Sequence, residues 1–495
     1  MNLSIATGLL AAPPRGGSVF SPPADPPEDP PAAPGSSATV LAIVPAAHWH
    51  AGSAAATLAE GRVLAAGSVT GPGVTAGAEG LGPLAMSDAL GRGFWRFTGG
   101  EYLDVGAGLT FANRAMATFA VGRMLSGNVA VFGPGNRTGY GAGPTTANTG
   151  GAALDTSTSG SLAPYVRGFS RGAQLDAANG HRIIAGAQLQ LMGAVSRSTA
   201  GGGTRLHLNT ATAAASQPSI NASGVIGAEI GRYPHSPGSS WARMDLYELV
   251  VFDRVLSDAE ADAVAAALVA NWAIPEVTSQ LVLEGDSISA GVGLEAGEAP
   301  AHRLGEPGTG RLPGHYRVYH VANSGNRVSH MLVRRDAAGS WATALLPGEN
   351  VMAFEIGRND FAAGVSAAEH RDNVVAYLHS EATGVMQRGW QVRAIANIAT
   401  GSSLQPQVED WRALLRAPAF AADIGAGPGG AFEGQFAIVS ADLIEQDGAT
   451  VFATTADTAG SPWYQGDATH PSAAGALLRV TGADTPQHGI AWGLV

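Results

Sequence analysis

The pattern of apolar residues changes near Pro275 of this 495-residue chain, and that change constrains the fold more than any other feature. Before Pro275, short β-prone runs alternate with clusters of Gly, Asn, Ser and Thr, which predicts a β-sandwich. After it, apolar strands alternate with helical stretches, as in a parallel sheet covered by helices on both faces. We therefore predict a multidomain chain: a Pro-rich segment (1–37), an all-β jelly-roll sandwich (38–275) and a three-layer, flavodoxin-like α/β/α domain (276–495).

The composition narrows the classes of ligand and chemistry. Glycine (68 residues) and proline (29) are abundant and only 14% of residues are charged, which favours turn-rich β structure. The net charge of −12, without any Lys/Arg-rich stretch, disfavours nucleic acid as a partner. Because the chain has no cysteine, its chemistry must come from serine, histidine and carboxylates. No apolar run approaches the roughly 20 residues of a membrane span, so we expect no membrane insertion.

The amino-terminal segment is rich in proline. Nine prolines lie between residues 12 and 37, a composition that favours extended polyproline conformation and cannot build a core. A disordered tail is the simplest interpretation; we favour an anchor that docks on a larger assembly, and we expect an oligomer. The first twelve residues carry no basic region, so no cleaved signal peptide is expected.

Within residues 38–275, two stretches carry most of the structural information. Residues 94–105 have the pattern of a hairpin. Residues 244–253 form an apolar strand, and Ser257 and Glu260 after it have the spacing of a capping box at the start of a helix.

These stretches also resemble a known family. Residues 247–257, followed by 260–272, resemble the end of concanavalin A-like (laminin-G-type) lectin domains, and 99–105 resemble one of their early strands. The resemblance implies a jelly roll and carbohydrate binding.

Two histidines near the start of the sandwich raise the question of a metal site. His48 and His50 are two residues apart, so on a strand they share a face and could ligate a metal. No third ligand is evident nearby. We therefore predict surface or hydrogen-bonded histidines and no metal.

Beyond Pro275, the predicted strands and helices alternate. Strands are expected at 280–284, 317–322, 350–356, 391–398 and 435–440, and helices at 366–383, 406–416 and 472–480. In such sheets the chemistry lies at the carboxyl ends of the strands.

A serine, an aspartate and a histidine follow predicted strand ends or precede a helix. Ser287 comes directly after the first strand, and it needs a base because serine is a poor nucleophile alone. Asp467 and His470 precede the last helix; the carboxylate can accept from His470 Nδ1 while Nε2 faces the serine. Asp and Ser also cap helices, which is the structural alternative for this segment.

An ester hydrolase also needs donors for the oxyanion, each worth about 3 kcal/mol. The second strand runs into a loop with Gly325, where the backbone can approach a substrate closely. The third strand runs into a loop with Asn359, whose amide can donate. Next to it, Arg358 is expected either to contact an anionic substrate or to lie on the surface. Trp463 and Tyr464 are candidates for an aromatic wall of the substrate site, with loop packing as the alternative.

These four segments, in this order, resemble the four blocks of the SGNH (GDSL-like) hydrolase family over residues 276–495. The resemblance implies that Ser287 is the nucleophile and donates its N–H to the oxyanion. It also implies that the Gly325 N–H and the Asn359 side chain complete this hole, that His470 is the base, oriented by Asp467, and that no cofactor is needed. The family often has an asparagine a few residues before the glycine, near the position where this chain has His320.

Together, these features predict a serine esterase, specifically an O-acetylesterase acting on a cell-surface or capsular polysaccharide that the lectin-like domain holds. A Pro-rich anchor, a lectin-like domain and a hydrolase-like domain also resemble spike or fibre proteins of bacteriophages and gene transfer agents. That resemblance implies a capsid or tail partner for residues 1–37, and a location on a phage-like particle or outside the cell. A non-catalytic capsule-binding adhesin and a lipid or aryl esterase with a passive sandwich are the alternatives.

Overall fold

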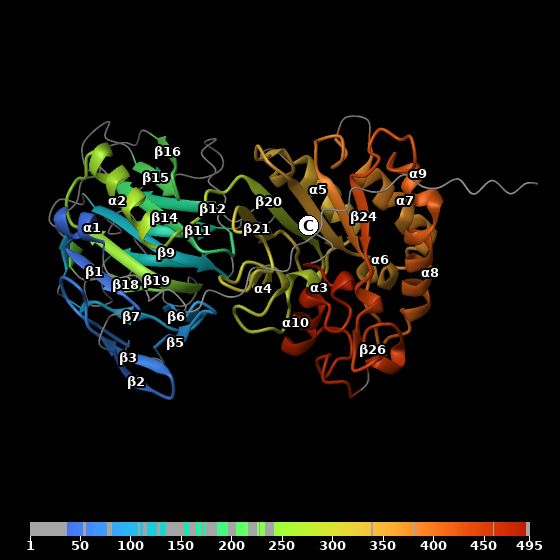
Figure 1. Cartoon of the computed structure of the whole chain (residues 1–495), viewed down its shortest axis with the longest axis horizontal. Coiled ribbons are helices and arrows are strands. Elements are labelled where there is room, and N and C mark those ends of the chain that lie inside the picture. Colours follow the sequence, from blue (N-terminus) through green and yellow to red (C-terminus); the bar gives the residue numbers. More distant parts are fainter. Residues whose placement is uncertain are drawn as a thin grey trace, which may run out of the picture.

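The computed structural model describes two halves that lie side by side (Figure 1). The described residues are 37–52, 56–76, 82–106, 109–111, 116–125, 129–134, 153–157, 165–170, 173–174, 186–196, 204–215, 225–226, 228–232, 242–337, 340–380, 383–458 and 460–491. The predicted Pro-rich anchor, residues 1–37, lies outside this set except for its last residue.

The described residues of the amino-terminal half form antiparallel strands and two helices. The helices are α1 (Ala38–Ala42) and α2 (Asp258–Asn271). The strands are β1 (Ala47–His50), β2 (Ala56–Ala59), β3 (Arg62–Ala66), β4 (Val74–Ala76), β5 (Leu84–Ser87), β6 (Gly93–Thr98), β7 (Leu103–Asp104), β8 (Thr110–Phe111), β9 (Met116–Met124), β10 (Val129–Pro134), β11 (Ala153–Ser157), β12 (Tyr165–Ser170), β13 (Ala173–Gln174), β14 (Gln190–Ser196), β15 (Thr204–Leu208), β16 (Ala211–Ala215), β17 (Val225–Ile226), β18 (Ala228–Ile230) and β19 (Arg243–Phe252).

Strand β9 organises this half because it is buried on both faces. It pairs with β14 on one side and β19 on the other, and all nine of its residues are buried. Its alternate side chains enter two different cores, with Met116 and Ala120 in one and Phe119 and Val121 in the other. The second core is closed by α2, which begins with the predicted capping box of Ser257 and Glu260.

The predicted hairpin at residues 94–105 is wrong. Strand β6 pairs with β5 and β19, whereas β7 pairs with β4 and β18. The connection between them is shaped by Glu101, whose carboxylate accepts the backbone N–H groups of Thr98, Gly99 and Gly100 at 2.8–3.1 Å. The chain therefore passes to new partner strands, which the alternation of side chains along each strand does not reveal.

The two histidines of β1 are buried, so neither lies on the surface, and His48 is hydrogen-bonded as the other predicted alternative has it. His48 Nε2 lies 2.5 Å from Glu248 Oε1 on β19, and both side chains are fully buried. His50 stacks on Trp272 with ring centroids 5.1 Å apart. Trp272 in turn donates its Nε1–H to the Glu248 carboxylate. Among the described residues, no group of three His, Asp or Glu side chains is arranged to hold a metal.

The carboxy-terminal half is built around a five-stranded parallel sheet. Its strands are β20 (Ser279–Gly285), β21 (Tyr316–His320), β22 (Asn350–Glu355), β23 (Gln391–Ile395) and β24 (Phe436–Val439), with a small antiparallel pair β25 (Glu445–Gln446) and β26 (Ala449–Thr450). Its helices are α3 (Ser287–Ala290), α4 (Pro300–Leu304), α5 (Val328–Asp336), α6 (Arg358–Ala362), α7 (Ala367–Leu378), α8 (Gln405–Arg416), α9 (Pro418–Asp423) and α10 (Ala473–Thr481). Short 3₁₀ helices are η3 (Trp341–Thr343), η4 (Ala441–Leu443), η5 (Thr455–Asp457) and η6 (Pro486–His488).

The strand order is β21-β20-β22-β23-β24, which is the order of flavodoxin-like folds. The five predicted strands and three predicted helices are confirmed, although the helix predicted at 366–383 ends at Leu378 and the strand predicted at 391–398 ends at Ile395. Successive residues of β20 enter different cores: Val282 joins the core beneath α5, α7 and α8, whereas Leu281 and Leu283 join the core beneath α4 and α10. Helices therefore cover both faces of the sheet.

The outer edge of β21 is covered by the amino-terminal half. Ala187 N–H donates to Val318 O at 2.7 Å, and Val318 N–H donates to the Gln188 side chain at 3.1 Å. These bonds satisfy backbone groups that an open sheet edge would expose.

A buried charge network lies beside this edge. Arg123 donates to the Asp245 carboxylate at 2.8 Å and across the interface to His302 O at 2.5 Å. Arg96 donates to the same Asp245 at 2.7 and 2.9 Å. Because these buried charges are paired and Arg123 also bonds to His302, the interface between the halves is stabilised by hydrogen bonds as well as by apolar contact.

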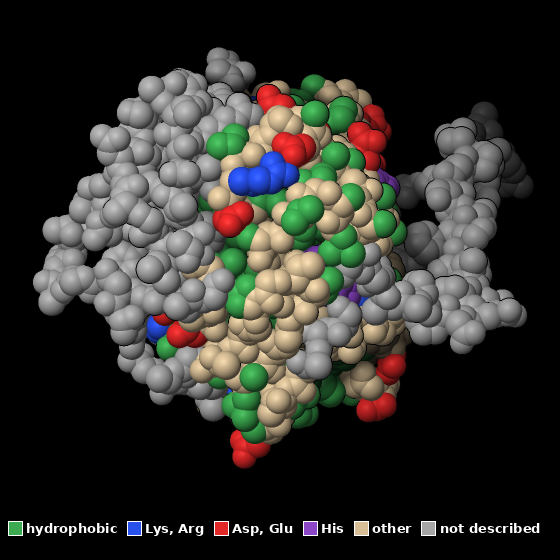
Figure 2. Space-filling model, turned by 90° about the vertical axis from the view of Figure 1, so that its left-hand side faces the viewer, with side chains coloured by type: hydrophobic (Ala, Val, Ile, Leu, Met, Phe, Trp, Pro, Cys, Tyr) green, Lys and Arg blue, Asp and Glu red, His purple; other side chains and the backbone are tan. Residues whose placement is uncertain are grey.

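Figure 2 shows one face of the amino-terminal half, on whose described part a few Lys and Arg side chains lie near acidic ones. The described part of this face is mostly uncharged, with scattered acidic side chains. Among the described residues, no helix is both long and apolar enough to cross a bilayer.

Candidate active site

The turn after β20 presents a serine at the carboxyl end of the parallel sheet. Asp286 caps α3 by accepting the Ile288 N–H at 3.0 Å, which makes Ser287 the first residue of that helix. The preceding Gly285 has φ +139°, and a Cβ atom there would lie 2.2 Å from Glu355 O on the neighbouring strand. Only glycine fits this turn, because a side chain would collide with β22.

Ser287, His470 and Asp467 form a continuous chain of hydrogen bonds. His470 Nε2 lies 2.8 Å from Ser287 Oγ. Its other ring nitrogen, Nδ1, lies 2.5 Å from Asp467 Oδ2. The carboxylate accepts at Nδ1, so the ring presents an unprotonated Nε2 to the serine hydroxyl. This arrangement can remove the proton of the serine.

The turn that carries the acid and the base is held by its own backbone. The other carboxylate oxygen of Asp467, Oδ1, accepts the backbone N–H groups of Thr469 and His470, each at 3.0 Å. Ala468, between Asp467 and Thr469, has φ +53°, an unfavourable conformation for alanine. Its carbonyl accepts the Gly401 N–H at 2.8 Å. Burial raises the pKa of Asp467, but the hydrogen bonds from His470 and these N–H groups outweigh it and lower the pKa below its ordinary value.

Two asparagines join the serine turn to the loop after β21 and to the first turn of α6, which follows β22. Asn326 Nδ2 donates to Gly285 O at 2.8 Å, and Asn359 Nδ2 donates to Asn326 O at 2.9 Å. Asn359 therefore lies beside the loop of Gly325, and one hydrogen of its amide remains to be donated. Gly325 itself has φ +77°, and a Cβ atom there would meet nothing within 4 Å, so its backbone borders open space.

Two backbone donors are available at this end of the sheet. Within the part of the chain that the structure describes, the N–H groups of Ser287 and Gly325 make no hydrogen bond. Together with the Asn359 amide, they are donors of the kind that an oxyanion requires.

The structure corrects the surface expectation for Arg358. Its side chain is 5% exposed, so it does not lie on the surface. Its guanidinium donates to Ile398 O and pairs with Glu355, which also pairs with Arg479. In the structure, the guanidinium therefore binds buried groups of the protein. Next to it, burial raises the pKa of the Asp286 carboxyl to about 6.

The two aromatic residues before the acid–base turn differ in exposure. Tyr464 is 5% exposed and its hydroxyl donates to Ala399 O at 3.1 Å, which is the packing alternative and not a substrate wall. Trp463 is only partly buried and packs at the edge of the core beneath α10, with its carbonyl accepting the Ser472 N–H. Trp463 stays a candidate for substrate contact.

Sequence reasoning missed three residues that the structure brings into this site. They are Asn326, which links two loops, Asp286, which caps α3, and Gln465, whose amide reaches from the acid–base turn to the loop after Ser287. Two glycines, Gly291 and Gly293, mark that loop in the sequence, but nothing local indicates which side chain lies against them.

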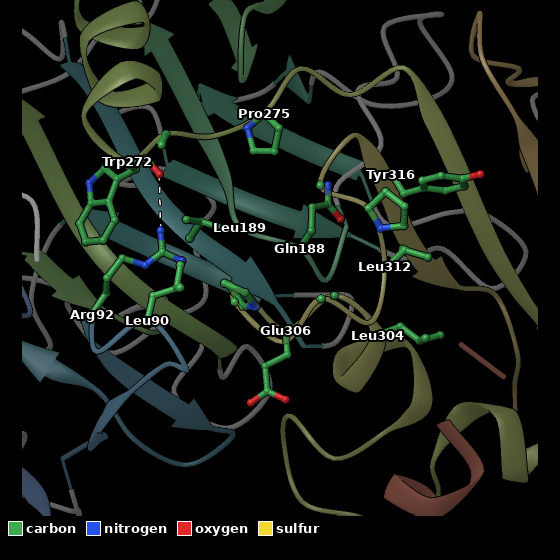
Figure 3. A pocket seen from close by; sticks show the side chains of 17 residues that line it. Leu90, Arg92, Gln188, Leu189, Trp272, Pro275, Leu304, Glu306, Leu312 and Tyr316 are labelled. Atoms are coloured by element: carbon green, nitrogen blue, oxygen red, sulfur yellow. Dashed lines mark hydrogen bonds between the residues drawn. The ribbon is translucent and has the colours of Figure 1, made fainter. Parts of the chain in front are cut away.

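A separate pocket lies between the two halves, away from the serine (Figure 3). It has a volume of about 480 Å³ and an apolar lining that includes Leu189, Pro275, Leu304 and Leu312. Its charged side chains are already paired, as with Arg92, which binds Asp88 at 2.8 Å. Ser287, His470 and Asp467 do not line this pocket.

No protein-family model matches the sequence, and no curated protein sequence is similar to it. Solved structures with some similarity include a lipolytic G-D-S-L family member from Veillonella parvula (16% identity, 40% of this chain, 93% of that chain, TM-score 0.30). They also include TesA (21% identity, 40% and 91%, TM-score 0.27) and domain 4 of AbnA, an extracellular GH43 arabinanase from Geobacillus stearothermophilus (11% identity, 45% and 98%, TM-score 0.32). Because these identities and TM-scores are low, the function is inferred from the geometry of this chain's own residues.

Proposed function

We propose that the carboxy-terminal half is a serine ester hydrolase of the SGNH (GDSL-like) kind. The hydrogen-bonded chain from Ser287 through His470 to Asp467 is the observation that carries this proposal, with distances of 2.8 and 2.5 Å. It supports nucleophilic catalysis because serine needs an oriented base to attack a carbonyl. The strand order and the loops of Gly325 and Asn359 agree with the resemblance drawn from the sequence.

The first half of the reaction forms an acyl-enzyme. Ser287 Oγ attacks the ester carbonyl carbon while its proton passes to His470 Nε2. Negative charge develops on the carbonyl oxygen, where the Ser287 N–H, the Gly325 N–H and the Asn359 amide would each stabilise it by about 3 kcal/mol. His470 then gives its proton to the departing alcohol as the carbon–oxygen bond breaks.

The second half releases the acid. Water attacks the acyl carbon while His470 removes its proton, the bond to Ser287 Oγ breaks, and the serine recovers its proton from His470. Asp467 keeps the ring in the tautomer that this cycle needs and stabilises the imidazolium formed in each half.

We propose an acylated polysaccharide as the substrate, with acetate as the acid released and the antiparallel half holding the glycan. Support comes from the lectin-like pattern in residues 247–272 and from the partly exposed Trp463 beside the acid–base turn. The spike-like order of segments supports a role on a phage-like particle or outside the cell, with residues 1–37 binding a capsid or tail protein.

The test measures binding and released acid in the same reaction. Purified protein is mixed with acetylated capsular polysaccharide, and separately with a short aryl acetate, and acetate is quantified. We expect release from both, loss of release in Ser287→Ala, and release unchanged in the matched control Ser289→Ala from the same helix. Release from the aryl ester alone would favour a lipid or aryl esterase with a passive sandwich. Polysaccharide binding without any acid release would favour a non-catalytic adhesin.

A further inference from the structure

A single glutamine joins the two loops on which the candidate triad is divided. Gln465 Nε2 donates to Val292 O at 2.9 Å and to Pro471 O at 2.9 Å. Val292 belongs to the loop after α3, and its N–H donates to Ser287 O at 2.9 Å. Pro471 follows directly on His470. The amide therefore spans the gap between the nucleophile and its base.

The orientation of this amide follows from its partners. Both are carbonyl oxygens, which accept but cannot donate, so the nitrogen of Gln465 must face them. The backbone of Gln465 also takes part, because its N–H donates to His470 O at 2.7 Å and its carbonyl accepts the Ala468 N–H at 3.0 Å.

The loop after Ser287 is shaped to receive this side chain. Gly293 has φ +79°, and a Cβ atom there would lie 2.2 Å from Gln465 Oε1. A side chain at position 293 would therefore displace the amide. The close contact between these two loops therefore needs both Gly293 and Gln465.

Few other contacts link the loop after Ser287 to the acid–base turn. The acid–base turn is otherwise tied to the loop after β23, through Gly401 N–H to Ala468 O at 2.8 Å. Among the hydrogen bonds of the described residues, Gln465 is the one side chain besides His470 that connects residues 465–472 with residues 286–293. Loops with exposed backbone are the parts of a fold that open most readily, so this link has a strong effect on their spacing.

We propose that Gln465 is a positioning residue that sets the distance between Ser287 Oγ and His470 Nε2. It touches no reacting atom and acts through His470. This inference rests on the proposed function, since it identifies the residue that keeps Ser287 and His470 of that site at their working distance.

The first test replaces the amide by a side chain of similar length that cannot donate. Gln465→Met should lower kcat on a short aryl acetate by about 10- to 100-fold, because a small misplacement of reacting groups carries a penalty of this size. KM should stay within about twofold of the wild-type value, because the substrate contacts are intact. The matched control is Gln391→Met, a partly exposed glutamine at the opposite end of the sheet that accepts from Arg393. Wild-type kcat in Gln465→Met would overturn the proposal.

A double-mutant comparison separates positioning from general damage. If Gln465 acts through His470, then Gln465→Met should have no further effect in a His470→Ala background. An equal loss in both backgrounds would mean that the glutamine does something else, and would overturn the proposal.

A second variant reaches the same contact from the other side. Gly293→Ala should lower kcat like Gln465→Met, because its methyl group displaces the amide. Gly448→Ala changes a glycine of similar φ (+77°) with nothing within 4 Å of its Cβ position, and so controls for backbone strain. Equal effects of the two glycine variants on kcat would count against the contact.

Hydrogen exchange tests the link without turnover. Peptides covering 465–471 and 288–293 should exchange faster in Gln465→Met than in the wild type or in Gln391→Met. Unchanged exchange would overturn the link whatever the activity. If the wild-type protein hydrolysed no ester but exchange rose as expected, the proposed function would fail while the structural link stood.

Discussion

The two halves of the molecule each contain a histidine paired with a carboxylate at 2.5 Å, yet the surroundings of the pairs differ. In the antiparallel half, His48 uses Nε2 to bind Glu248, and both side chains are fully buried. In the parallel half, His470 uses Nδ1 to bind Asp467, and the side chains are 21% and 48% exposed. The distance alone therefore does not distinguish a structural pair from a reactive one.

The second ring nitrogen makes the difference. His48 Nδ1 is buried and has no hydrogen-bond partner within the described part of the chain. His470 Nε2 faces Ser287 Oγ at the open end of a parallel sheet, where loops from several strands meet. A histidine–carboxylate pair is suited to catalysis only where the ring also reaches a nucleophile and the substrate can reach both.

The largest effect is expected from Ser287→Ala. It should lower kcat for ester hydrolysis by a factor on the order of 10⁴ to 10⁶, because the residual rate comes from the remaining donors and binding alone. Adding His470→Ala should cause little further loss, since the two residues act as a unit. The rates of the two single variants and the double variant check this. Losses that multiply would contradict a shared step.

Asp467→Asn should have the next largest effect. The amide can donate where the carboxylate accepts, which favours the wrong tautomer of His470, and kcat should fall on the order of 10⁴-fold. Thermal unfolding should change little, because the Asp467 side chain is half exposed. Wild-type turnover in this variant would mean that another group orients the ring.

Asn359→Ala should lower kcat by about 10²- to 10³-fold, the usual effect of removing one oxyanion donor. KM should change far less, because the donor acts on charge that develops in the transition state. Steady-state kinetics on the aryl acetate measure both. A rise in KM at constant kcat would instead place Asn359 in ground-state binding.

His48→Leu tests the other member of the comparison. It leaves the buried Glu248 carboxylate with the Trp272 N–H as its one remaining described hydrogen-bond partner, which should lower the free energy of unfolding by about 3 kcal/mol. The kcat of the folded protein should be unchanged, because this pair lies in the antiparallel half. Chemical denaturation and kinetics on the same preparation decide this. A kcat loss without destabilisation would give His48 a role in the reaction.

The smallest effect concerns Asp286, whose pKa burial raises to about 6. Between about pH 4 and 6, the folded protein holds this proton more tightly than the unfolded chain, so stability is present below that window and is lost as the pH rises through it. Asp286→Asn removes the titration. The difference in unfolding free energy between wild type and variant should therefore shift in favour of the variant as pH rises from 4 to 6. A difference independent of pH would contradict the raised pKa.

Much of the carboxy-terminal half could be predicted from the sequence, because its strands are continuous apolar runs bounded by loops. Ser287, Asp467 and His470 stand at the ends of such elements, so their convergence follows from parallel topology. The turn of residues 94–105 could not be predicted, because alternation along a strand does not reveal which strand will pair with it. Glu101 shapes that turn by accepting hydrogen bonds from backbone N–H groups, and the sequence pattern does not indicate these bonds.

Side chains whose role depends on distant partners could not be assigned either. Arg358 begins helix α6 after β22, yet its guanidinium binds Glu355 and the carbonyl of Ile398. Gln465 binds Val292, 173 positions away in the chain. Such contacts are set by tertiary packing, and local sequence carries no signal for them.

The most direct test of the central claim is whether Ser287 becomes covalently modified. A fluorophosphonate reacts with a serine only when a base activates it, and peptide mass spectrometry then locates the adduct. The hydrogen bonds of Ser287 and His470 predict one adduct per chain, on Ser287, and far slower labelling in His470→Ala. No adduct, or an adduct on another residue at the same rate in His470→Ala, would contradict the assignment of Ser287 as the nucleophile.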